Sequence, residues 1–132
     1  MENKISALIT GGSSGLGEAT VREIIKNGGN VSIMDSQEEK AKVLINELGD
    51  SCSFFKTDVT NEESVNEAIK ASIDKLKHIN LLVNCAGIGI ASKVIGKEKL
   101  HDTNIFQKVI NVNLIGSFNV LKLAAEKMIE NK

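Results

Sequence analysis

A glycine-rich segment near the start of the chain has the composition of a phosphate-binding turn. It reads Thr-Gly-Gly-Ser-Ser-Gly-Leu-Gly over residues 10–17, and its spaced glycines are Gly11, Gly15 and Gly17. An apolar run of strand length precedes it, and apolar residues at helical spacing follow it. At such a junction a bare backbone can approach a pyrophosphate, and the first helical turn offers free N–H groups and a positive dipole. The alternative is a turn whose glycines only supply a positive φ.

An acidic residue lies at the spacing from this turn that suits recognition of a ribose. Asp35 closes the second apolar run, 20 residues after Gly15, where a carboxylate can accept hydrogen bonds from both hydroxyls of an adenine ribose. Residues 36–39 are Ser, Gln, Glu and Glu, so no basic side chain follows to neutralise a 2′-phosphate. The pattern therefore predicts NAD rather than NADP. The alternative is an acid that interacts only with the dipole of the next helix.

Two further polar segments follow the third and fourth apolar runs. Asp58 and Val59 come directly after residues 52–57, and the segment Asn-Cys-Ala-Gly over 84–87 closes the run 79–84. In open α/β sheets, ligands bind at the carboxyl ends of the parallel strands. Each segment alone fits a turn or a helix N-cap equally well. Together with the glycine turn, the two segments predict one crevice.

Strand-like and helical segments alternate along the chain and determine where these residues must lie. Strands are expected over 5–10, 30–35, 52–57 and 79–84, a loop over 88–103 and a long helix over 104–130. Between the strands, apolar residues recur at helical spacing and predict helices. Two of these helices follow capping-box pairs, Ser36 with Glu39 and Thr60 with Glu63. Connections of this length require parallel strands. We expect an α/β, Rossmann-like, doubly wound parallel sheet in the order 3-2-1-4, truncated after the fourth strand and its following helix.

Composition indicates the class of protein. The 132 residues are 42% apolar and 25% charged, and sixteen basic against seventeen acidic residues give a net charge of -1. This balance predicts one soluble domain over residues 1–132, with no positive field to attract nucleic acid or a membrane surface. Glu2, Lys4 and a short apolar run do not make a secretion signal. We therefore expect a cytoplasmic protein, with the mitochondrial matrix as the alternative.

The cysteines do not indicate a metal site. Cys52 and Cys85 lie 33 residues apart, with no second cysteine or histidine at ligand spacing. We therefore expect two reduced thiols and no bound metal. The chain also contains no tyrosine, which removes phenolic acid–base chemistry from these residues.

The motifs, taken in order, resemble those of the short-chain dehydrogenase/reductase family. The matching segments are the turn over 10–17, Asp35, the pair Asp58 and Val59, the Asn-x-Ala-Gly segment over 84–87 and the Asn-Val-Asn segment over 111–113. The chain is most similar to the branch of type 2 3-hydroxyacyl-CoA dehydrogenases, also described as type 10 17β-hydroxysteroid dehydrogenases. The loop after the fourth strand is lengthened in that branch, as residues 88–103 are here.

The resemblance implies a binding site for NAD. It implies that Ser14, Gly15 and Leu16 contact the pyrophosphate and ribose, and that Asp35 holds the adenosine ribose. It also implies that residues 58–59 hold the adenine and that Cys85, as a small wall residue, and Gly87 line the path to the nicotinamide ribose. The cofactor-binding residues expected from the motifs and the resemblance are Gly11, Ser14, Gly15, Leu16, Gly17, Asp35, Asp58, Val59, Asn84, Cys85 and Gly87.

The resemblance extends over the whole chain but covers only the N-terminal half of the family's fold. Asn113 matches the Asn of the family's Asn-Ser-Tyr-Lys tetrad, whose role is to kink its helix and fix a water; Asn111 and Asn119 are nearby alternatives. The tetrad's Ser, Tyr and Lys would follow in the second half and have no counterpart here. His101, in the lengthened loop, is expected to be solvated rather than catalytic.

Two functions remain open from the sequence. The first is the NAD-binding half of an NAD-dependent oxidoreductase that acts on a small secondary alcohol or ketone, of the 3-hydroxyacyl-CoA or hydroxysteroid type. The second is a nucleotide-binding or interaction module without chemistry. Under either function, the 132 residues alone are expected to lack turnover.

The long helix over 104–130 is too apolar to have only one buried face. In the family, the corresponding helix packs on the sheet with one face and on a partner subunit with the other. In addition, the outer edge of the fourth strand is expected to be unpaired. We therefore expect a homo-oligomer formed through this helix.

Overall fold

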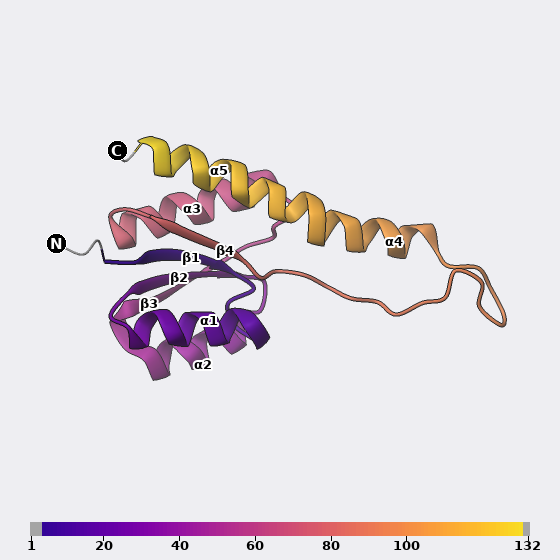
Figure 1. The fold of residues 1–132 in the computed structure, drawn as a ribbon, viewed down its shortest axis with the longest axis horizontal. Helices are drawn as coiled ribbons and strands as arrows, with labels where there is room; N and C mark the ends of the chain where they lie inside the picture. Colours follow the sequence, from indigo (N-terminus) through magenta and orange to yellow (C-terminus); the bar gives the residue numbers. More distant parts are fainter. Residues whose placement is uncertain (1–3, 131–132) are drawn as a thin grey trace.

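Four short strands form a parallel sheet in the order β3-β2-β1-β4 (Figure 1). A computed structural model describes residues 4–130 of the chain. Glu2, which the sequence analysis used to argue against a secretion signal, lies outside the described residues. The strands are β1 (Ser6–Thr10), β2 (Asn30–Asp35), β3 (Cys52–Lys56) and β4 (Leu81–Asn84). The Rossmann-like, doubly wound fold class expected from the sequence is confirmed.

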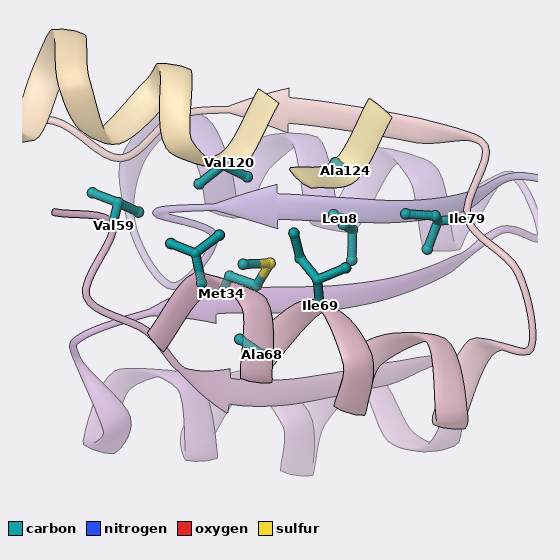
Figure 2. Packing of buried hydrophobic residues seen from close by; sticks show 9 residues of the cluster. Leu8, Met34, Val59, Ala68, Ile69, Ile79, Val120 and Ala124 are labelled. Carbon is teal, nitrogen blue, oxygen red and sulfur yellow. The ribbon is translucent and has the colours of Figure 1, made fainter. Parts of the chain in front are cut away.

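Helices cover both faces of the sheet (Figure 1). The helices α1 (Gly15–Lys26) and α2 (Glu38–Leu48) lie on one face, and α3 (Glu62–Leu76) and α5 (Ser117–Glu130) lie on the other. Neighbouring residues of a strand therefore point into different cores. Ala7 and Ile9 pack with Val21 of α1, whereas Leu8 packs with the residues of α3 and α5. Figure 2 shows Leu8 and Met34 between Ile69 of α3 and Val120 of α5.

The fourth strand is shorter than the sequence predicts, because an asparagine side chain takes the place of backbone hydrogen bonds to the chain at the start of β1. Asn80 accepts a hydrogen bond from the Ser6 N–H through Oδ1 at 2.9 Å and donates through Nδ2 to the carbonyl of Lys4 at 3.0 Å. Regular pairing begins at Leu81, opposite Ala7. Within residues 4–130, β4 pairs only with β1, so its outer edge is unpaired.

The two capping boxes expected from the sequence are wrong. The helix α2 begins after Gln37 without a side-chain cap, and α3 is capped by Asn61, whose side chain accepts from the Ser64 N–H at 3.0 Å. In each case an aspartate just before the helix accounts for the difference. Asp35 accepts from the Gln37 N–H, and Asp58 accepts from the N–H and hydroxyl of Thr60. These tight Asp turns use the local donors and shift the start of each helix by one residue.

The long C-terminal helix contains a π-helical segment. It consists of α4 (Thr103–Ile110), a π-helical stretch η2 (Asn111–Gly116) and α5, and it starts after Asp102, whose side chain caps the Asn104 N–H. The expected start at residue 104 is therefore correct to within one residue. Gly116 lies against the side chain of Val59, and a Cβ at this glycine would lie 2.6 Å from Val59 Cγ2. A side chain at Gly116 would push the C-terminal helix away from the segment that joins β3 to α3.

The segment between β4 and α4 extends away from the sheet (Figure 1). It contains one isolated antiparallel bridge, between Ile95 and Leu100. The helix α4 also projects beyond the sheet, and none of its residues is buried. Over residues 4–130, no helix combines the length and apolarity needed to cross a membrane.

A buried amide joins α5 to the chain after β3 and provides a test of the packing. Asn119 is buried, and its Nδ2 donates to the carbonyl of Val59 at 3.0 Å. We expect Asn119→Ala to lower the free energy of unfolding by about 1–3 kcal/mol more than Asn66→Ala, because the substitution leaves a buried carbonyl without its donor. Urea unfolding followed by circular dichroism measures the difference.

Asn66 is the matched control because it lies within α3 and is only partly buried. The gain in helix propensity from Asn to Ala is common to both variants and cancels in the comparison. Equal unfolding energies for the two variants would mean that the Asn119 hydrogen bond does not stabilise the fold.

Candidate functional site

A cleft of about 410 Å³ lies at the carboxyl ends of the strands. Ten of the eleven cofactor-binding residues expected from the sequence line it, namely Gly11, Ser14, Gly15, Leu16, Gly17, Asp35, Asp58, Val59, Cys85 and Gly87. The sequence did not identify the other lining residues, which are Met34, Ser36, Gln37, Thr57, Ala86, Ile88 and Val112. The structure therefore brings the glycine turn and the segments after β2, β3 and β4 to one cleft.

The three spaced glycines of the turn are required for two geometric reasons. A Cβ on Gly11 would lie 2.8 Å from the backbone of Cys85 and Ala86. A Cβ on Gly17 would lie 2.1 Å from the Gly11 carbonyl oxygen, so α1 could not start this close to β1. Gly15 has free space around it but a φ of +55°, which favours glycine. Close approach and backbone conformation both operate, so the turn does more than supply positive φ.

Thr10 joins the first and fourth strands at the base of the cleft. The side chain is fully buried, and its Oγ1 accepts hydrogen bonds from the N–H groups of Cys85 and Ala86, each at 3.1 Å. These are the residues that the Gly11 backbone approaches. The sequence analysis gave Thr10 no role of its own, because its partners lie 75 and 76 residues away along the chain.

The carboxylate of Asp35 lies at the cleft wall and is held by backbone and side-chain donors. Its Oδ2 accepts from the Ser13 N–H at 3.1 Å and from the Ser13 hydroxyl, and its Oδ1 accepts from the Gln37 N–H at 3.0 Å. Only 7% of Asp35 is exposed. No basic residue within 4–130 forms a salt bridge with it. The sequence analysis did not identify Ser13 as part of the site.

The pair after β3 contributes one polar and one apolar residue. Asp58 is exposed, and its Oδ1 accepts from the N–H and hydroxyl of Thr60 at 2.9 and 2.6 Å. Val59 is buried, and it packs in the core beside Val120 while also lining the cleft. Figure 2 shows the two valines on facing segments. An apolar wall beside a polar rim suits the flat face of a base.

The direct cofactor contact expected of Asn84 is not supported by its position. Asn84 does not line the cleft. Its Oδ1 lies 3.4 Å from Thr10 Oγ1, which donates to it, and its Nδ2 donates to the Ser117 carbonyl at 3.3 Å. The side chain is therefore used to join β4 to β1 and to α5. Cys85, the next residue, does line the cleft, as expected of a wall residue.

Asn113 lies in the π-helical stretch and contacts the chain just after β4. Its Oδ1 accepts from the Ile88 N–H and its Nδ2 donates to the Ile88 carbonyl, both at 2.8 Å. The side chain thus pairs with one residue of the cleft rim as a neighbouring strand would. None of the three asparagines, Asn111, Asn113 and Asn119, lines the cleft. Asn113 alone hydrogen-bonds to a lining residue after β4, whereas Asn119 donates to the Val59 carbonyl.

His101 is outside the cleft. It is half-buried rather than solvated, and its ring packs edge-on against Phe106 with the centroids 6.3 Å apart. Its Nδ1 is buried and has no hydrogen-bond partner within residues 4–130. The same part of the chain contains no group of three or more histidines, cysteines or acids that could hold a metal ion.

Comparisons with known proteins agree with this arrangement. Residues 6–132 match the model of the family described as short chain dehydrogenase. The chain is 42% identical over 128 residues to 3-hydroxyacyl-CoA dehydrogenase type-2 of Bos taurus, which covers 96% of this chain and 49% of that protein. It is 40% identical to the protein of the same name in Drosophila melanogaster, covering 100% of this chain and 52% of that one.

Solved structures give the same result. A 3-ketoacyl-(acyl-carrier-protein) reductase from Brucella melitensis, complexed with NADH, superposes with a TM-score of 0.88 at 32% identity and covers 98% of this chain and 52% of its own. A 3-hydroxyacyl-CoA dehydrogenase type-2 from Mycobacterium avium gives 0.85 at 38% identity, covering 93% and 49%. This chain spans about half the length of the relatives it matches.

The two thiols are expected to differ in reactivity. Burial raises the pKa of Cys52 to about 11 and also raises the pKa of Cys85, which lies in the cleft wall. Only the thiolate reacts with iodoacetamide, so a raised pKa slows alkylation at neutral pH. We expect Cys85 to be alkylated slowly, with a rate that rises up to about tenfold per pH unit between pH 7 and 9. Cys52 should stay unmodified.

Peptide mass spectrometry after timed labelling measures both sites. The variant Cys85→Ser should show no labelling of the folded protein, which assigns the signal. Labelling of Cys52 at the rate of Cys85 would show that the core around β3 is open to reagent.

Proposed function

The chain belongs to the short chain dehydrogenase family, and we propose that it supplies the NAD-binding half of an oxidoreductase that acts on secondary alcohols. The observation that carries this proposal is the meeting of the glycine turn and the Asp35 carboxylate in one cleft. We assign residues 1–132 to a single NAD-binding Rossmann domain. The relatives named 3-hydroxyacyl-CoA dehydrogenase type-2 favour a 3-hydroxyacyl-CoA substrate, with a hydroxysteroid as the alternative.

The residues of the cleft fit a dinucleotide. The glycine turn leaves backbone N–H groups bare at the start of α1, where side chains at Gly11 or Gly17 would collide with backbone. A phosphate can approach such a turn closely and gains from the helix dipole. We propose that the pyrophosphate lies against Ser14, Gly15 and Leu16, whose side chain is 84% exposed at the cleft edge.

The other contacts follow along the cleft. Asp35 would accept a hydrogen bond from the adenosine ribose, and the apolar side of Val59 and the Asp58 backbone would hold the adenine. Cys85 and Gly87 would flank the nicotinamide ribose. A larger side chain at position 87 would have little room, because its Cβ would lie 3.3 Å from Asn113 Oδ1.

When bound, NAD would accept a hydride from the carbinol carbon of the substrate. The residues of this chain bind and orient the cofactor, and Asn113 holds the cleft rim through Ile88. Removal of the hydroxyl proton needs an acid–base group beside the substrate. In the family this is a Tyr activated by Lys, and these 132 residues contain no tyrosine. We therefore propose that the 132 residues alone bind NAD without oxidising substrate.

Nucleotide titration tests the proposed cofactor. We expect the chain to bind NAD at least about tenfold more tightly than NADP, because the fixed carboxylate of Asp35 repels a 2′-phosphate. The variant Asp35→Asn keeps the shape of the side chain and removes its charge, and it should bring the two affinities together. Isothermal titration calorimetry measures all four dissociation constants. Equal affinity of the original chain for both nucleotides would contradict the role of Asp35.

The same samples test turnover. With NAD and a 3-hydroxyacyl-CoA or a hydroxysteroid, absorbance of NADH should not rise above background. The matched control is Gly15→Val, which strains the positive φ of the turn and should abolish binding. Turnover that survives repurification and disappears in Gly15→Val would mean that a residue of this chain replaces the missing Tyr.

We also propose that the chain forms homo-oligomers through the helices α4 and α5. The exposed apolar residues on these helices and on the stretch η2 between them include Phe106, Ile110, Leu114, Phe118 and Leu121. They belong to one continuous helical segment, in which α5 contacts β4 and α4 projects beyond the sheet. Within residues 4–130 the outer edge of β4 is unpaired. An apolar surface of this kind is stabilised by association.

Light scattering after size exclusion at micromolar concentration tests the interface. We expect a dimer or larger, and we expect Leu121→Glu to shift it to the monomer because the substitution places a charge on the buried face. Leu121 is 53% exposed in the single chain; Val43 on α2 is 68% exposed, and Val43→Glu is the control that should leave the assembly unchanged. A monomeric original chain would contradict the proposal.

A further inference from the structure

We propose that Ser13 determines how strongly the site discriminates NAD from NADP, by fixing the orientation of the Asp35 carboxylate. This inference rests on the proposed function and goes beyond it, because it assigns selectivity to a residue that does not touch the cofactor. Ser13 does not line the cleft and is only 4% exposed. It contacts Asp35 from behind the cleft wall, so we describe it as a positioning residue.

The geometry of the contact leaves one acceptor direction of the carboxylate for the ligand. A carboxylate oxygen has about two acceptor directions. Ser13 fills both directions of Oδ2, with its N–H at 3.1 Å and with its hydroxyl. Oδ1 receives only the Gln37 N–H, at 3.0 Å. The remaining acceptor direction on Oδ1 is therefore the one available to a ribose hydroxyl in the cleft.

The same donors also take the place of a counter-ion. Asp35 is 7% exposed and forms no salt bridge with any basic residue of the range 4–130. A buried charge requires hydrogen-bond donors when no cation is close. The donors from Ser13 and Gln37 are dipoles without net charge, so they orient the carboxylate and leave its negative charge in place at the cleft wall.

A fixed, unpaired charge is what discriminates between the two nucleotides. The 2′-phosphate of NADP would approach Asp35, and the carboxylate could reduce the repulsion only by turning away. The two donors of Ser13 prevent that turn. In Ser13→Ala the N–H remains but the hydroxyl is lost, so Oδ2 has a free direction and the carboxylate can rotate. NAD loses a well-placed acceptor and NADP meets less repulsion, so both changes lower the preference.

A double-mutant cycle tests the coupling. The variants are S13A, D35N and S13A/D35N, each titrated with NAD and with NADP by calorimetry. We expect S13A to lower the NAD preference about tenfold, the effect of roughly one hydrogen bond to a charged group. S13A should have no further effect in the D35N background, because Ser13 acts through the carboxylate. An unchanged preference in S13A, or an equal loss in both backgrounds, would overturn the proposal.

A conservative variant separates the hydroxyl from the volume of the side chain. Ser13→Thr keeps the hydroxyl and should retain more of the preference than S13A; a loss as large as that of S13A would show that packing, not donation, is responsible. The outcome also distinguishes the two proposals. If the original chain binds neither nucleotide, the proposed function fails and this inference with it. If it prefers NAD and S13A does so equally, only the role of Ser13 fails.

Discussion

The cleft depends on one close contact between the ends of β1 and β4. The Gly11 backbone approaches the peptide between Cys85 and Ala86 so closely that a Cβ on Gly11 would collide with it. The Thr10 hydroxyl accepts hydrogen bonds from the N–H groups of the same two residues. This contact brings the turn after β1 and the segment after β4 together. Without it, the glycine turn would face solvent on one side, and the two halves of the cleft would be separate loops.

The two acids of the cleft, Asp35 and Asp58, also shape the turns that leave the sheet. Asp35 ends β2 and Asp58 lies two residues after β3, and each accepts a hydrogen bond from a backbone N–H two residues later. These turns direct the chain from the sheet into the next helix while keeping the carboxylate at the cleft. The cost of placing Asp35 in a nearly buried position is offset by its donors rather than by a cation. The same arrangement gives the site its negative charge.

Sequence periodicity predicted the fold, and the motifs with the family resemblance predicted most of the cleft. The alternation of apolar runs and helical stripes predicts four parallel strands and their order, and ten of eleven expected cofactor residues line one cleft. Periodicity cannot detect a hydrogen bond between residues far apart in the sequence. Ser13 with Asp35 and Thr10 with residues 85–86 were missed for that reason. Local rules failed at the two capping boxes, where Asp35 and Asp58 accept from the nearby N–H groups. They also could not show that Asn84 hydrogen-bonds to Thr10 and Ser117.

The sheet order also separates early from late events in folding. The β1 and β2 strands pair across a single helical crossover, as do β2 and β3, whereas the Ser6 N–H bonds to Asn80, 74 residues away. Closing a longer loop costs more chain entropy, and distant pairings form more slowly. The first three strands with α1 and α2 can therefore assemble before β4 adds to the edge. The wall of the cleft formed by residues 85–88 comes into place with β4, so the cleft is complete only once this long-range pairing has formed.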